Sequence, residues 1–162
     1  MTDTPYAETG GDTGDRPARG GDRTARRQRP QRASGRAPHS EAERSLVERL
    51  TSAFEANDVE AIVALLSEDV RFTMPPLEYD GRELAARFLQ AVTLQERRRN
   101  RVVATRANGQ PAFGLYVRDP GGRIFHAMGL LVLNLAGDEV CAITRFDNSV
   151  LARFGLPREL PR

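Results

Sequence analysis

Residues 105–122 read TRANGQPAFGLYVRDPGG, and this stretch decides how the second half of the chain folds. Two turn signals, Asn108-Gly109 and the run at 119–122, enclose a segment in which apolar residues alternate. Asn and Gly both tolerate a positive φ, so Asn-Gly between such segments is typical of a β-hairpin. We therefore expect strands at 101–107 and 111–118, joined by a tight turn.

The sequence after this hairpin continues the same pattern. Residues 123–135 form a long apolar segment, 136–138 hold a turn signal, and 139–147 again alternate. These features predict two more strands, and the short connections favour antiparallel neighbours. The four expected strands form an antiparallel meander, and both of its faces are largely apolar. A partner subunit covering one face would explain this, so a homodimer is one expectation.

Three helices are expected before the meander. Ser40 and Glu43 form a capping box, S-x-x-E, in front of apolar residues at helical spacing. Asn57-Asp58 ends that helix and caps a second one, and Asp80 resembles the cap of a third.

A short strand at 70–74 is expected between the second and third helices. Pro75-Pro76 ends it, because proline cannot donate a hydrogen bond to a strand ladder. Three N-terminal helices packed on a curved antiparallel sheet make an α+β fold.

The chain has 162 residues, which suits one domain and a tail. Residues 1–39 hold eight Arg and almost no large apolar residue, so we expect a disordered Arg-rich tail in front of a domain at 40–162. The tail would be either a weak nucleic-acid arm or a solubilising extension. The second interpretation is favoured, because no aromatic residue lies among the arginines of 16–36 to stack on bases.

Several function classes are not expected. Cys141 is the only cysteine, which excludes an internal disulfide and favours a reducing cytoplasm. No apolar run approaches the roughly 18 residues of a membrane span. His39 and His126 are the only histidines, and the glycines match no phosphate-binding motif, so neither a metal nor a cofactor is expected.

Strand alternation places a set of polar residues on an apolar face. A mostly apolar concavity with a few polar groups is typical of a small-molecule pocket. The predicted pocket residues on this face are Phe113, Leu115, His126, Met128, Leu130, Ile143, Arg145 and Asp147. The alternative is that Arg145 and Asp147 form a structural ion pair while His126 is a satisfied histidine.

Residues 43–156 resemble the SnoaL-like branch of the nuclear transport factor 2-like superfamily, whose fold is cone-shaped. The segments that carry the resemblance are TMPP, YDGRELAARFL, HAMGLLVL and ITRFDNSVLARFGLP, together with the hairpin quoted first. Four of them, TMPP, the hairpin, HAMGLLVL and ITRFDNSVLARFGLP, are similar more narrowly to the C-terminal SnoaL-like domain of one group of extracytoplasmic-function sigma factors. The resemblance implies docking onto a sigma factor or RNA polymerase, with sensing of a small apolar ligand. The sigma regions expected upstream have no counterpart in 1–40, which implies a stand-alone accessory domain or a truncated descendant.

The superfamily also contains enzymes. In the resemblance to a ketosteroid-isomerase site, the position of the base falls on Met74, and the positions of the two oxyanion donors fall on Leu50 and Leu130. The same resemblance adds Met74 to the predicted pocket. Alkyl groups and a thioether cannot move a proton, so a non-catalytic ligand- or protein-binding domain is expected. The alternative is an isomerase- or cyclase-like enzyme for an apolar polycyclic substrate, which would use His126 with Asp147 or Arg145.

Overall fold

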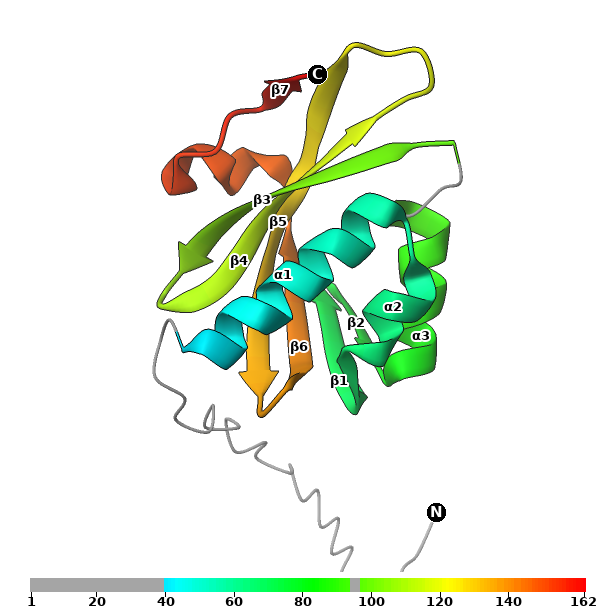
Figure 1. The fold of residues 1–162 in the computed structure, drawn as a ribbon, viewed down its shortest axis with the longest axis vertical. Helices are drawn as coiled ribbons and strands as arrows, with labels where there is room; N and C mark the ends of the chain where they lie inside the picture. The colour runs from blue at the N-terminus through cyan, green and yellow to red at the C-terminus, as the bar shows by residue number, and fades with distance from the viewer. Residues whose placement is uncertain (1–39, 94–96) are drawn as a thin grey trace, which may run out of the picture. The chain divides into compact units, whose positions relative to one another are not determined.

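The computed structural model describes residues 40–93 and 97–162 (Figure 1). In this part of the chain, helices pack on a long, curved sheet, so the predicted α+β fold is confirmed. The tail predicted at 1–39 lies outside the described residues. No helix in the described ranges is long and apolar enough to cross a membrane.

The first two helices begin where their capping residues predict. Helix α1 spans Glu41–Ala56, and the Ser40 hydroxyl accepts a hydrogen bond from the Glu43 amide at 3.2 Å. Asn57 ends α1 in a left-handed conformation with φ 58°. Asp58 caps α2, Val59–Ala64, by accepting a hydrogen bond from the amide of Ala61 at 2.9 Å. Helix α1 turns its apolar stripe to the sheet and buries Leu46, Leu50, Ala53 and Phe54.

The third helix begins differently from the prediction. Strand β1, Leu66–Met74, is followed by a strand that the sequence did not indicate, β2, Leu77–Asp80. Asp80 lies opposite Arg71 in this ladder, with Arg71 Nε 3.3 Å from its Oδ1. Its prediction as a helix cap is therefore wrong. Helix α3, Arg82–Phe88, begins after Gly81 and continues into the π-helical turn η1, Leu89–Thr93.

The predicted meander is present in the second half of the chain. It consists of β3, Arg99–Ala107; β4, Gln110–Arg118; β5, Ile124–Ala136; and β6, Glu139–Phe146. The strand order is β2-β1-β6-β5-β4-β3, and β7, Glu159–Pro161, pairs with β5. Strand β1 runs parallel to β6, so the sheet is mixed rather than wholly antiparallel.

A β-bulge in β5 changes which side chains share a face. Leu115 pairs with Gly129 and Tyr116 pairs with Ala127, so Met128 has no partner on β4. Because side chains alternate along a strand, one extra residue moves every following side chain to the opposite face. The alternation assumed from the sequence therefore fails after Met128.

The bulge decides on which side of the sheet Leu130 lies. Leu130 pairs with Gly114 and packs with Tyr116 on the face away from α1, whereas Leu131 pairs with Phe113 in the core beneath the helices. The prediction that Leu130 shares a face with Phe113 is wrong for this reason, and Leu131 takes that place.

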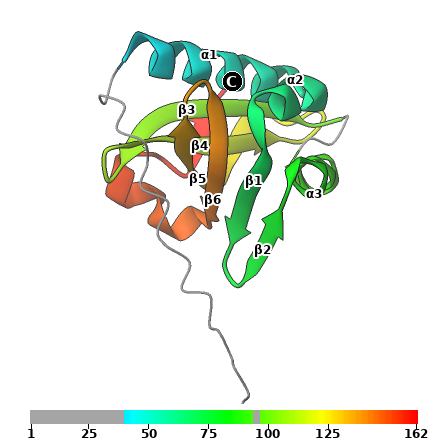
Figure 2. The same ribbon diagram turned by 90° about the horizontal axis from the view of Figure 1, so that it is seen from below.

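The second apolar face is covered by the chain's own C-terminal segment. Helix η2, Asn148–Phe154, packs on this face through Leu151, and Leu156 packs beside it. The hydroxyl of Tyr116 donates a hydrogen bond to the carbonyl oxygen of Pro157 at 2.8 Å. Figure 2 shows α1 and this segment on opposite sides of the sheet. The apolar face therefore has a cover within the chain, and the homodimer stays a prediction.

The bulge depends on a residue without a side chain. Gly129 has φ 147°, and a Cβ built there would overlap the carbonyl oxygen of Phe146 on β6. We expect Gly129→Ala to lower the unfolding free energy by about 3 kcal/mol, because both the backbone and the contact must change.

The matched control is Gly137→Ala. Gly137 has φ 60° but its Cβ would meet no described atom within 4 Å, so only the left-handed backbone opposes the change, at about 1 kcal/mol. Urea unfolding measures both variants. Equal losses would contradict the role assigned to Gly129.

Candidate functional site

The guanidinium of Arg145 joins three strands at the end of the helix-side core. Its Nη1 donates to the thioether sulfur of Met74 on β1 at 2.8 Å. Its Nη2 donates to the carbonyl oxygen of Met128 on β5 at 2.9 Å. The structure thus brings together three of the residues predicted to line a pocket, and we call Met74, Met128 and Arg145 the Arg145 cluster.

Strand register explains why these three residues meet. Phe72 pairs with Ile143 across the parallel β1–β6 ladder. Two residues further along the same register, Met74 lies opposite Arg145, and both side chains are on the same face as Phe72 and Ile143. Arg145 also pairs with Leu131 on β5. The bulge leaves Met128 without a partner on β4, and its carbonyl oxygen accepts from Arg145.

The charge of Arg145 is only partly compensated. Burial lowers the pKa of its guanidinium below the usual value, and the charge of Asp147 offsets this in part. No carboxylate among the described residues forms an ion pair with it. Its Nε–H is buried and has no acceptor within hydrogen-bond distance in the described part of the chain. A buried donor without an acceptor raises the free energy of the folded state.

Half-buried apolar side chains lie at the margin of the helix-side core. They include two members of the cluster, Met74 and Met128, and also Tyr79 on β2. The Tyr79 ring lies 5.5 Å from that of Phe88, and Phe72 lies 4.6 Å from Phe88 between ring centroids. Sequence reasoning missed Tyr79 because it missed β2, on which Tyr79 lies.

Other predicted pocket residues belong to the packed core. Phe113 and Ile143 are 0% exposed and Leu115 is 2% exposed. Leu50 is also 0% exposed and lies in the same core. These side chains pack inside the core and expose almost no surface.

The remaining polar candidates have other partners. The His126 side chain is 63% exposed, and its Nδ1 lies 3.4 Å from Oε1 of Glu159 on β7. Asp147 is exposed and caps η2, where its Oδ1 accepts from the amide of Ser149 at 2.8 Å. The predicted set of His126 with Asp147 or Arg145 is therefore distributed over separate contacts. In the described residues, no group of three or more His, Cys, Asp or Glu is placed to hold a metal ion.

The chain is similar in sequence to a known domain family. The family model described as the SnoaL-like domain matches residues 47–147, which include the whole cluster. The chain belongs to the SnoaL-like domain family. The resemblance predicted from the sequence is confirmed.

The curated relatives of this SnoaL-like domain include a sigma factor. The ECF RNA polymerase sigma factor SigG, from two strains of Mycobacterium tuberculosis, is 32% identical to the chain over 128 residues. The match covers 76% of this chain and 34% of the sigma factor. The chain therefore spans about a third of the length of these relatives.

Solved structures share the SnoaL-like fold at low sequence identity. An NTF2-like protein of unknown function from Mesorhizobium loti matches with a TM-score of 0.56 and 14% identity, covering 71% of this chain and 98% of that one. The Δ5-3-ketosteroid isomerase from Mycobacterium sp. matches with a TM-score of 0.50 and 14% identity, covering 66% and 93%. At 14% identity the likeness supports the fold alone and carries no conclusion about the chemistry of this chain.

Asp147 gives a prediction for the pH dependence of stability. Hydrogen bonds from the side chain and the amide of Ser149, with a smaller contribution from Arg145, hold the pKa of Asp147 below its usual value. Its stabilisation is therefore present above the unfolded pKa of about 3.9 and is lost as pH falls through the lower folded pKa.

Thermal unfolding of the wild type and Asp147→Ala between pH 7 and pH 2 measures this contribution. We expect the gap in Tm to be constant near neutral pH and to narrow below about pH 4. Ser149→Ala removes one of the two donors, so the folded-state pKa of Asp147 should rise toward its unfolded value. The difference in Tm that Asp147 causes should then be smaller, and it should be lost at a higher pH. A gap that is unchanged at pH 2 would contradict the prediction.

The orphaned donor of Arg145 gives a second prediction. Replacing a partly buried cation that has no carboxylate partner by an apolar side chain of similar length is often neutral, so Arg145→Met should stay within about 1 kcal/mol of the wild type. The control is Arg106→Met. Arg106 lies 2.6 Å from Oε1 of the buried Glu43 and donates to the carbonyl oxygen of Gly109, so its loss should cost about 2 kcal/mol. Urea unfolding compares them, and an equally large loss for Arg145→Met would assign it a structural role.

Proposed function

We propose that this chain is a non-catalytic SnoaL-like regulatory domain of the sigma-factor type, which binds a small ligand at the Arg145 cluster. The ligand would carry a carbonyl or carboxylate oxygen for Arg145 and an apolar body for Met74, Tyr79 and Met128. We place this role in the cytoplasm, with a sigma factor or RNA polymerase as its protein partner.

The observation that carries the proposal is the chemistry available at the cluster. Arg145 is the charged group there, and an arginine keeps its proton near neutral pH and cannot act as a general base. Its described partners are a thioether and a backbone carbonyl oxygen, which do not accept a proton from substrate either. An unsatisfied cationic donor beside half-buried apolar groups is a better match to ligand recognition than to proton transfer.

The sigma-factor relative supports the regulatory part of the proposal. The match covers 128 residues, which are 76% of this chain and 34% of the sigma factor. Contact with a sigma factor or RNA polymerase is part of the proposal and is supported by this relative alone.

Ligand binding is tested with thermal unfolding of the full chain and two probes, a 3-ketosteroid and decanoate. We expect at least one probe to raise the Tm saturably, and Arg145→Met to abolish the rise because the cation that meets the oxygen is gone. Arg87→Met is the matched control, since Arg87 is an exposed arginine paired with Glu83 at 2.6 Å on α3. A rise of the same size in all three proteins would assign the probe to another site.

Two further measurements separate the competing functions. Purified RNA polymerase and sigma factors of the encoding organism should be retained by the immobilised chain, and retention of neither would contradict the regulatory role. Isomerisation of a Δ5-3-ketosteroid is expected to be undetectable. Turnover that Arg145→Met or His126→Ala removes would favour the enzyme instead.

A further inference from the structure

A second candidate site lies beside the loop at 119–122, which joins β4 to β5. A cavity of about 320 Å³ opens there, a volume typical of small-ligand sites. It is lined by the side chains of Arg97, Arg99, Arg118, Arg123 and Arg162, with Asp119 as the acidic residue of its lining. We call these five residues the arginine pocket.

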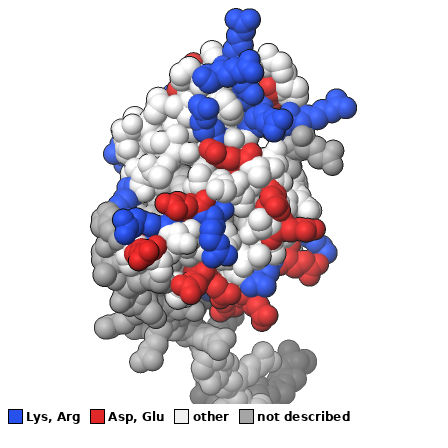
Figure 3. Space-filling view, viewed as in Figure 1, with Lys and Arg blue, Asp and Glu red and all other residues white. Residues whose placement is uncertain are grey.

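The arginine pocket belongs to a broad separation of charge. Residues 41–93 hold eleven acidic residues and five Arg, whereas residues 97–162 hold eleven Arg and five acidic residues. Figure 3 shows basic side chains gathered at the end of the molecule where β7 and the β4–β5 loop lie, and acidic side chains lower in the view, over the helices. The pocket lies at this basic end, where an anion would be attracted.

Strand pairing holds like charges next to one another in the pocket. Arg99 lies directly opposite Arg118 in the β3–β4 ladder. Ile124 lies opposite Pro161 in the β5–β7 ladder, and the next step of that register places Arg123 beside Arg162. Like charges directly opposite one another destabilise a sheet. An anion bound between them would reverse the sign of this interaction.

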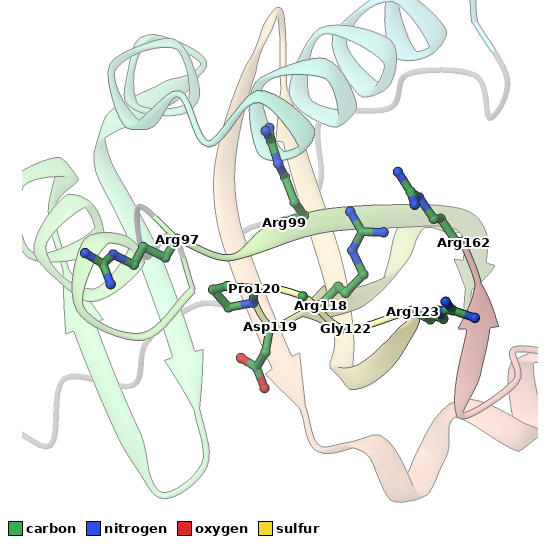
Figure 4. Close-up of a pocket in the computed structure, with 9 residues that line it drawn as sticks. Arg97, Arg99, Arg118, Asp119, Pro120, Gly122, Arg123 and Arg162 are labelled. Carbon is green, nitrogen blue, oxygen red and sulfur yellow. The ribbon is translucent and has the colours of Figure 1, made fainter.

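The described residues leave these charges uncompensated. None of the five pocket arginines forms an ion pair with a carboxylate in the described ranges. Asp119 is itself occupied, since its Oδ1 lies 3.0 Å from Nε of Arg98, which is outside the pocket. Figure 4 shows Arg99 and Arg118 pointing to the same side of their strands, with the Asp119 carboxylate directed to the other side.

One pocket arginine is also held in place. The guanidinium carbon of Arg118 lies 4.8 Å from the centroid of the buried Phe125 ring, as does that of Arg101. Cation–π contact of this kind restricts the side chain without neutralising its charge. Arg118 is therefore positioned in advance and keeps its hydrogen-bond donors for a ligand.

We propose that the arginine pocket binds a small anion with several phosphate groups, either a free oligophosphate or the triphosphate of a nucleotide. The planar guanidinium matches phosphate oxygens with two parallel hydrogen bonds, and several arginines around one cavity match several phosphates. The small, concave cavity favours such a molecule over the extended backbone of a nucleic acid. The proposal concerns a different part of the sheet from the Arg145 cluster and does not depend on the proposed function.

The test uses the full chain, labelled with ¹⁵N, and sodium tripolyphosphate at about 0.15 M salt, where distant charges are screened. The amides of Gly121 and Gly122 report on the pocket itself, whereas the arginines of 1–39 would affect other signals. We expect saturable shifts of these two amides at a stoichiometry of one. Arg99→Gln combined with Arg123→Gln, one residue from each like-charged pair, should weaken binding about tenfold or more.

The control variant removes the same charge elsewhere. Arg49 on α1 and Arg153 on η2 are exposed and lie outside every ion pair of the described residues. Arg49→Gln with Arg153→Gln should bind tripolyphosphate as the wild type does. The pocket variant should unfold at the same Tm as the wild type or higher without ligand, because like-charge repulsion is relieved.

A second arm with ATP identifies the source of the phosphates. Tighter binding of ATP than of tripolyphosphate assigns the pocket to a nucleotide, and equal or weaker binding assigns it to a free oligophosphate. The proposal is overturned if millimolar tripolyphosphate leaves both glycine amides unshifted, or if the pocket and control variants lose affinity equally. It is also overturned if a single-stranded oligonucleotide shifts these amides and tripolyphosphate does not.

Discussion

Because Met128 has no partner on β4, strand β5 changes faces part-way along its length. Before the bulge, the odd-numbered Phe125 and Ala127 pack beneath the C-terminal segment, and after it the odd-numbered Leu131 and Leu133 pack beneath the helices. A single extra residue therefore decides which side chains of β5 enter which core. Gly129 makes this possible, since its backbone comes too close to the Phe146 carbonyl for a side chain. The bulge also provides the carbonyl oxygen that Arg145 uses, so core packing and the candidate site share one cause.

Local signals in the sequence predicted most elements correctly. Ser40 and Asp58 cap helices through contacts three residues away, which a short window of sequence contains. The meander followed from turn residues and alternation, which are local as well. Strand β2 was missed because its four residues are mostly exposed and show no alternation of burial. Helix η2 was missed because it is stabilised by Leu151, which packs on residues of β4 and β5 that are distant in the sequence.

The sequence predicted several residues of the candidate site correctly, but it did not predict which of them contact one another. Met74, Met128 and Arg145 do meet, because β1 and β6 lie side by side in parallel register. Leu130 was placed on the wrong face because a bulge shifts the pattern, and only its partner strands reveal where. The glycine at 129 was the available signal, since glycine inside a strand often marks a bulge. His126 lies opposite Val117 on β4 and so shares its face, as the alternation predicts, whereas Asp147 lies just beyond the end of β6. Their contacts are with Glu159 and Ser149, which lie in segments beyond the meander.

The two candidate sites differ in chemistry and meet on one strand. Arg145 is a single cation at the margin of an apolar core and suits one oxygen on an apolar body, whereas the arginine pocket presents several cations to water and suits several charges. Arg123 at the pocket directly precedes β5, and Met128 at the bulge lies within that strand, about 16 Å further along at a rise of roughly 3.3 Å per residue. Phe125 lies between them in the sequence. Its ring contacts the guanidinium of Arg118 and also packs in the core beneath the C-terminal segment. Under the two proposals, occupancy of either site would act on the same strand segment, and any coupling between the sites must be equal in both directions. In a domain that regulates by binding, this segment would connect an anion at one end to a ligand at the other.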